Sequence, residues 1–168
     1  MKTDTPLTPH AGRLVRVSLD ESSVGVSPLQ EAERARAIDD LQAEAWFVPV
    51  LRGVAAPDGG EYDLHLSVSE NRLVFDVRRT DGTKLVVHVL ALGPFRSVLR
   101  DYQLLVASHA AAIEDGRDAR LQAIDMGRRG LHDEGARMVV QRLDGKIGID
   151  FATARRLFTL LCVLQQRG

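Results

Sequence analysis

Two adjacent arginines and a histidine lie in segment 124–135, which reads Ile-Asp-Met-Gly-Arg-Arg-Gly-Leu-His-Asp-Glu-Gly. Guanidinium groups donate paired hydrogen bonds to carboxylate and phosphate oxygens, which suits them to anion binding. The segment therefore predicts a binding site for an anion, or for the acidic group of a partner, formed by Arg128, Arg129, His132 and Glu134. The structural alternative is salt bridging within the chain, with Asp125 and Glu134 as the carboxylates.

A second arginine pair, Arg155 and Arg156, lies one turn into the last predicted helix. If this pair meets Arg128 and Arg129 in space, four guanidinium groups form a basic pocket. Adjacent arginines on a helix point about 100° apart, so at most some of the four can converge. The alternative is that the pair is exposed to solvent, with its apolar stems packed on the surface.

A polar cluster is also predicted on one face of a sheet, formed by His65, Asp76 and His88. A carboxylate opposite a histidine orients the imidazole and raises its basicity, which prepares a general base. A solvated sheet face explains the same residues. No nucleophile accompanies the cluster, because Cys162 lies among apolar residues and no serine occupies a G-x-S-x-G turn. Enzymatic activity is therefore left open, with a non-enzymatic role favoured.

The sequence matches no metal or cofactor signature, so neither group is expected. Residues 132–134 share the H-x-E of zinc deaminases, but these also need P-C-x-x-C, and the chain has one cysteine. The glycines match neither G-x-G-x-x-G nor a P-loop. Gly127 and Gly135 fall on the apolar side of their predicted helix, where tight packing against another element explains them.

The elements that position these residues follow from hydrophobic periodicity. Alternation predicts a strand over 13–19, and Ser27 followed by Pro28 begins a helix that ends near Trp46 and is stopped by Pro49. The charged face of this helix is expected to be solvated. Residues 53–60, rich in glycine, are expected to form a loop.

A meander of three strands is predicted from Tyr62 to about Leu90. A two-residue turn at 70–71 sets His65 opposite Asp76, and residues 80–82 fit a three-residue loop. A slip of one residue in the second hairpin would place His88 among apolar groups, which argues against it. The expected core face is Leu64, Leu66, Val68, Leu73, Phe75, Val77, Leu85, Val87 and Val89.

The second half of the chain is predicted to be mainly helical. Helices are expected from Pro94 to Gly116 and from about 118 to 143, closed by Gly145, with a short edge strand over 146–149. Asp150 caps a last helix. Its apolar residues cover roughly two thirds of its circumference, wider than the stripe of a surface helix. This helix either runs through the centre of the domain or forms a subunit interface.

Composition limits the fold and the partners. The 168 residues, with 22 basic and 23 acidic side chains, indicate a flexible tail over 1–12 and one α+β domain over 13–168. We expect an antiparallel meander of three to five strands packed against about four helices. A net charge of −1 argues against nucleic acid as a partner. No apolar stretch is long enough for a membrane span, and the single cysteine favours the cytoplasm.

The stretch from about Arg13 to Gly168 resembles a bacterial family known as uncharacterised protein family 0262. The resemblance rests on Ile124 to His132 with Glu134-Gly135, and on Phe151, Thr153 to Leu160, Cys162 to Leu164 and Arg167-Gly168. It implies a bacterial intracellular setting and no particular activity.

The resulting hypothesis is a regulatory or protein-interaction module, a homodimer through its last helix, that engages an acidic or phosphorylated partner. The alternative is a small enzyme or a domain that binds a small molecule or anion, through the face of His65 and Asp76 or through the arginines. A concave pocket with converging polar groups favours the alternative, and a flat exposed patch with an apolar centre favours the interaction module.

Overall fold

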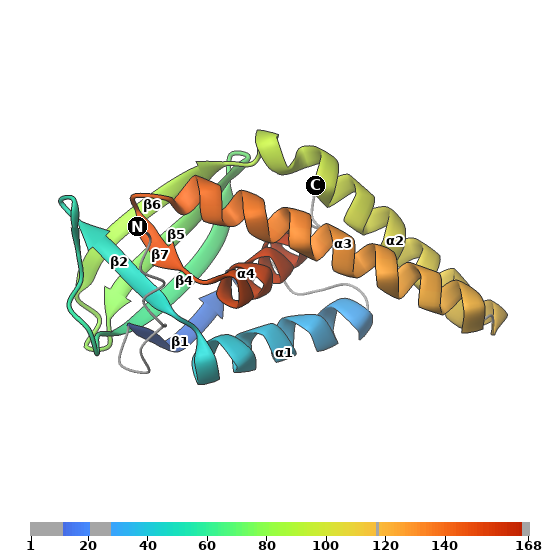
Figure 1. Ribbon diagram of the computed structural model, residues 1–168, viewed down its shortest axis with the longest axis horizontal. Coiled ribbons are helices and arrows are strands. Elements are labelled where there is room, and N and C mark those ends of the chain that lie inside the picture. The colour runs from blue at the N-terminus through green and yellow to red at the C-terminus, as the bar shows by residue number, and fades with distance from the viewer. Residues whose placement is uncertain (1–11, 21–27, 117, 166–168) are drawn as a thin grey trace, which may run out of the picture.

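The computed structural model describes residues 12–20, 28–116 and 118–165, and within them the chain is an α+β fold, as predicted (Figure 1). The predicted tail over 1–12, apart from Gly12, and the predicted cap Ser27 lie outside the described residues. The elements are β1 (Arg13–Leu19), α1 (Pro28–Glu44), β2 (Phe47–Leu51), β3 (Val54–Ala55), β4 (Glu61–Ser69), β5 (Arg72–Arg79), β6 (Lys84–Ala91), η2 (Gly93–Phe95), α2 (Arg96–Asp115), α3 (Asp118–Leu143), β7 (Ile147–Ile149) and α4 (Phe151–Leu164).

The larger sheet has the strand order β1-β4-β5-β6. β1 runs parallel to β4, whereas the β4–β5 and β5–β6 pairs are antiparallel. The predicted register of the first hairpin is confirmed, because His65 pairs with Asp76. Glu70 and Asn71 form its turn with φ angles of 50° and 61°, the left-handed conformation that a tight two-residue hairpin turn requires.

The second hairpin differs from the prediction by one residue. The β5–β6 register shifts between Val77 and Arg78, because Leu85 is an extra residue on β6. Such a bulge reverses the side on which every later residue of the strand points. The sequence pattern gave no sign of it, because residues 85–87 are all apolar and fit either face.

His88 consequently lies on the core face of the sheet, opposite Phe75. Val87 and Val89 point outward and are 49% and 47% exposed. The prediction that His88 joins His65 and Asp76 on the polar face is therefore wrong, as is the placement of these two valines in the core.

A second sheet, with the order β3-β2-β7, was only partly predicted. β7 is the expected short strand, and it pairs with β2 rather than with the meander. β2 begins one residue after Trp46 and contains Pro49, which the sequence analysis read only as a helix stop. β3 lies in the segment expected to be a loop. Phe47 and Ile147 anchor this sheet in the core, since both are fully buried.

α4 runs through the centre of the chain, between α1 and α3 (Figure 1). Asp150 caps it by accepting a hydrogen bond of 2.8 Å from the backbone N–H of Thr153, as predicted. Of the two roles predicted for this helix, the structure shows the one in which it runs through the centre of the domain. The predicted homodimer would need another surface and stays a prediction. The buried residues of α4 are Thr153, Ala154, Leu157, Phe158, Leu160, Leu161, Cys162, Val163 and Leu164.

Gly135 brings α3 close to α4. A Cβ atom at this position would overlap the ring of Phe158, so the absence of a side chain sets the distance between the helices. The tight packing predicted for this glycine is thus observed. It also fixes how the polar residues of α3 face those of α4.

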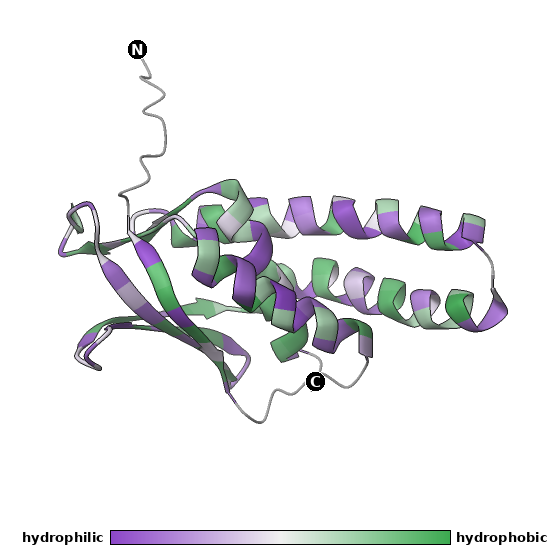
Figure 2. Cartoon of the chain, turned by 90° about the horizontal axis from the view of Figure 1, so that it is seen from below, coloured by the Kyte–Doolittle hydropathy of each residue, from purple (hydrophilic) through white to green (hydrophobic). Residues whose placement is uncertain are grey.

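α2 and α3 form a long antiparallel hairpin that projects beyond the sheets and α4 (Figure 1 and Figure 2). Gly116, with φ at 66°, ends α2 in the left-handed conformation, as predicted. In the described part of the chain, no helix combines the length and apolar character that a membrane crossing requires.

Candidate functional site

A pocket of about 400 Å³ lies where α1, α3 and α4 meet. Both predicted arginine pairs and His132 line it, whereas Glu134 is exposed and does not. Five arginines face only two carboxylates there. The lining residues are Glu33, Arg36, Ala37, Asp40, Arg128, Arg129, His132, Ala152, Arg155, Arg156 and Thr159.

Helical spacing brings these side chains to one place. Arg128 and His132 are four residues apart on α3 and so share one face. The contribution of α1 has the spacing i, i+3, i+4, i+7, again a single face, in Glu33, Arg36, Ala37 and Asp40. The charged face of this helix was expected to be solvated, so these residues were not predicted to line a site. The spacing was visible, but nothing in the sequence indicated that this face lies against another helix.

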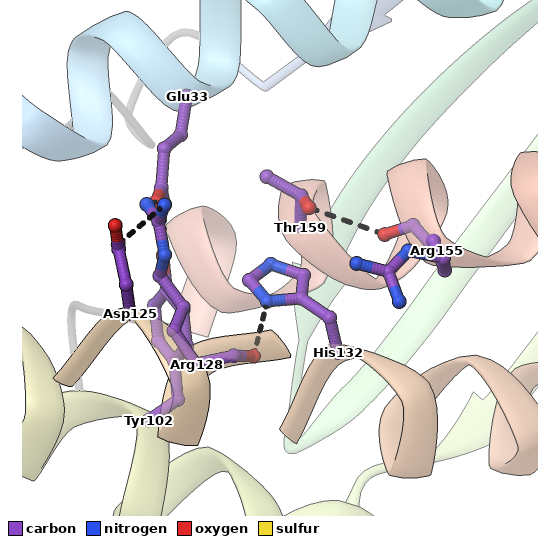
Figure 3. A network of polar contacts seen from close by, with 7 residues as sticks. All are labelled: Glu33, Tyr102, Asp125, Arg128, His132, Arg155 and Thr159. Atoms are coloured by element: carbon purple, nitrogen blue, oxygen red, sulfur yellow. Dashed lines mark hydrogen bonds and ion pairs between the residues drawn. The ribbon is translucent and has the colours of Figure 1, made fainter. Parts of the chain in front are cut away.

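Glu33 is the centre of a network of polar contacts at the base of the pocket (Figure 3). Its side chain is only 13% exposed and forms an ion pair with Arg128. It also accepts a hydrogen bond from the Tyr102 hydroxyl, whose pKa is raised above its usual range mainly by burial. Arg128 donates a further hydrogen bond of 3.1 Å to Asp125, so its charge is matched within the chain.

His132 lies beside this network in a fixed orientation. Its Nδ1 is 2.8 Å from the carbonyl oxygen of Arg128, and because a carbonyl only accepts, Nδ1 carries the hydrogen. The ring packs edge-on against Tyr102 and Phe158 at centroid distances of 5.5 and 5.7 Å. Burial lowers its pKa, so the ring is neutral at pH 7.

The arginines of α4 are held by carboxylates from two helices. Arg155 forms an ion pair with Asp133 of α3. Arg156 lies 3.3 Å from Asp40 and 3.1 Å from Glu44 of α1. Salt bridging with Asp125, the predicted alternative for Arg128, is thus observed, whereas the ion pairs of Arg155 and Arg156 were not predicted.

Two pocket arginines differ from the others. Within residues 12–20, 28–116 and 118–165, neither Arg36 nor Arg129 has a carboxylate partner. Both are exposed and line the pocket. Their charges are available to a bound anion.

The sheet cluster does not form a site. His65 and Asp76 are paired across β4 and β5, but Asp76 binds Arg78 at 3.1 Å, and Nδ1 of His65 is 2.7 Å from the Ser18 hydroxyl. His88 is on the opposite face, where burial lowers its pKa. The carboxylate that was expected to orient the imidazole is therefore engaged elsewhere.

The buried thiol of Cys162 is not arranged for nucleophilic chemistry. Cys162 is 1% exposed, and burial raises the pKa of its thiol, which disfavours the thiolate. Among the described residues, no group of three or more histidine, cysteine, aspartate or glutamate side chains is arranged to hold a metal ion.

The family model described as "Uncharacterised protein family (UPF0262)" matches residues 11–167, almost the whole chain. The chain belongs to the UPF0262 family. This confirms the resemblance noted from segments 124–135 and 151–168. The matched range, residues 11–167, includes the α3 and α4 residues that line the pocket.

Bacterial UPF0262 relatives match at high identity. A UPF0262 protein of Granulibacter bethesdensis is 54% identical over 166 residues, 96% of this chain and 94% of the relative. One of Acidiphilium cryptum is 57% identical over 94% of both chains, and one of Bradyrhizobium sp. strain ORS 278 is 46% identical over 100% of this chain and 98% of its own. The names of these relatives state no activity, and no solved structure matches the chain.

Proposed function

We propose that this UPF0262 protein is a binding domain for a small anionic ligand that carries a phosphate or carboxylate group. The observation that carries this proposal is the gathering of five arginines in one pocket, two of which have no carboxylate partner among the described residues. Guanidinium groups match the planar geometry of such anions.

The size of the site suits a small ligand. A volume of about 400 Å³ lies within the range of small-molecule pockets. Arg128 and Arg156 are matched by carboxylates and act as a fixed frame, whereas Arg36 and Arg129 supply the net positive charge. Substitution of a carboxylate-paired arginine should therefore affect stability, whereas substitution of Arg36 or Arg129 should affect anion binding.

A second candidate is the docking of an acidic or phosphorylated segment of a partner protein. It is favoured by the exposure of Arg36 and Arg129, which a side chain from another protein could reach. In both candidates the chain binds an anion and performs no catalysis. Both place the protein in the cytoplasm, where the single buried Cys162 stays reduced.

Calorimetric titration with inorganic phosphate, citrate and an acidic peptide tests the proposal. We expect Arg129→Ala and Arg36→Ala each to weaken phosphate or citrate binding by about tenfold, the effect of one charged hydrogen bond. Arg137→Ala is the matched control, because Arg137 is also an exposed α3 arginine but lies outside the pocket. Binding of the peptide alone would support the partner candidate, and equal losses in all three variants would contradict both candidates.

A further inference from the structure

The two neutral polar side chains that line the pocket, His132 and Thr159, have the same hydrogen-bonding pattern. His132 donates through Nδ1 to the carbonyl of Arg128 at 2.8 Å, and Thr159 donates through its hydroxyl to the carbonyl of Arg155 at 3.1 Å (Figure 3). Each carbonyl belongs to the residue four positions earlier in the same helix. Because both hydrogens are used in this way, each side chain has only lone pairs left for a ligand.

The unprotonated ring nitrogen of His132, its hydrogen-bond acceptor, is held in place. The residue is 8% exposed, and its second ring nitrogen, Nε2, is turned away from the α3 backbone towards α4 (Figure 3). Among the described residues no hydrogen bond to Nε2 is found. Burial lowers the pKa of the ring and outweighs the hydrogen bond to the Arg128 carbonyl and the charge of Glu33, which raise it, while the charges of Arg155 and Arg128 lower it by smaller amounts. The ring therefore offers an acceptor at pH 7.

The carboxylates of the pocket are already engaged. Glu33 is bound by Tyr102 and Arg128, and Asp40 lies against Arg156. A ligand in the pocket thus meets donors on the arginines and an unused acceptor at His132. An oxyanion without any hydrogen can satisfy the arginines but places a lone pair against Nε2.

We propose that His132 selects anions that carry a hydrogen on or beside the charged group, as hydrogen phosphate and phosphate monoesters with a neighbouring hydroxyl do. The selection rests on the proposed function and names its ligand class. The charged oxygens of the ligand accept from the arginines, while its O–H donates to Nε2. Sulfate has the same shape as phosphate but no hydrogen at neutral pH, so the pocket discriminates against it.

Calorimetric titration of the full chain with inorganic phosphate and with sulfate, at pH 7 and constant ionic strength, tests this selection. The wild-type protein is expected to bind phosphate at least about tenfold more tightly, since an unmatched buried acceptor costs about as much as one hydrogen bond. His132→Asn keeps an N–H near the position of Nδ1 but has no atom at Nε2. It should weaken phosphate binding and remove the penalty on sulfate, so that the preference for phosphate falls by about tenfold.

Two further variants support the interpretation. His132→Gln can place its amide oxygen near the position of Nε2 and should restore part of the preference for phosphate. Arg137→Ala should keep the full preference. A preference that is unchanged in His132→Asn would overturn the assignment to His132.

The outcomes separate this inference from the proposed function. Equal binding of phosphate and sulfate by the wild type, with both weakened in Arg129→Ala, overturns the selection and leaves the anion pocket standing. If phosphate, sulfate and citrate all fail to bind, both proposals fall. The wild-type comparison needs no substitution, so it decides the question even if a variant does not fold.

Discussion

Arg128 of α3 forms an ion pair with Glu33 of α1, and this contact joins the two helices at the base of the pocket. The Glu33 side chain is 13% exposed and that of Arg128 is 30% exposed. The pair is therefore partly shielded from water, and the loss of either partner leaves a poorly solvated charge.

Removal of this guanidinium should lower the stability of the fold. We expect Arg128→Ala to reduce the free energy of unfolding by about 2 kcal/mol, less than for a fully buried pair because Arg128 is partly exposed. Arg129→Ala should change it by less than about 0.5 kcal/mol, because Arg129 has no carboxylate partner among the described residues. Urea denaturation measures both. Similar losses in the two variants would show that the ion pair does not stabilise the fold.

A double-mutant cycle separates the pair from other effects of the substitution. Glu33→Gln removes the charge and keeps a side-chain oxygen for the Tyr102 hydroxyl. If the pair is the cause, Arg128→Ala should cost less in the Glu33→Gln background than in the wild type. Independent, additive effects would argue against direct coupling.

Two glycines of α3 should respond oppositely to alanine. A Cβ at Gly135 would overlap the Phe158 ring, so Gly135→Ala should destabilise the protein by about 1–3 kcal/mol. Gly130 is exposed, and a Cβ there meets nothing within 4 Å. Gly130→Ala should therefore stabilise by up to about 1 kcal/mol through helix propensity. Thermal unfolding distinguishes the two signs, and a stabilised Gly135→Ala variant would disprove the close approach of α3 and α4.

The neutral state of His132 predicts a pH dependence. Its pKa is lowered in the folded chain, chiefly by burial, so below its unfolded value of about 6.5 the unfolded chain binds more protons. The contribution of this group to stability is complete above that value and is lost as pH falls through the window down to the folded pKa. The titratable and charged groups around the ring are Glu33 on α1, Tyr102 on α2, Arg128 on α3 and Arg155 on α4.

Urea denaturation between pH 7.5 and about 5 measures this dependence. His132→Asn should show a shallower loss of stability towards low pH than the wild type. The loss should not vanish, because the pKa of His88 is also lowered by burial and acts in the same direction. Parallel profiles of the two proteins would contradict a buried neutral His132.

The central position of α4 makes a further prediction. Leu160 is fully buried within the single chain, so Leu160→Glu should prevent folding and give an insoluble product. A well-folded monomer in place of a dimer would instead indicate a subunit interface. Solubility, circular dichroism and sedimentation of the purified variant check this outcome.

The sequence predicted the elements whose signals are local. The 70–71 turn and the alternation of β4 and β5 fix their own register, and the helix ends at Gly116 and Asp150 carry their own caps. The side on which His88 lies could not be predicted, because the bulge at Leu85 falls in an apolar run that fits either face. β2 was missed because the signal of Pro49 resembles a helix stop.

The pocket was predicted only in part, for the same physical reason. Spacing within α3 and within α4 identified the two arginine pairs, but the sequence left open whether the two pairs come together in space. Whether they meet depends on how closely the helices approach, which Gly135 and Phe158 determine through a contact distant in sequence. The charged residues of α1, among them Glu33 and Arg36, have the pattern of an ordinary solvated helix face and became interpretable only in three dimensions.

Native mass spectrometry of the protein, purified gently from its own host, tests the anion pocket most directly, because it measures the mass of any retained ligand. We predict that the wild type and Arg137→Ala carry a small anionic molecule and that the Arg36→Ala/Arg129→Ala double variant does not. A wild-type chain that carries only a second protein, or a small molecule retained equally by the double variant, would contradict the account.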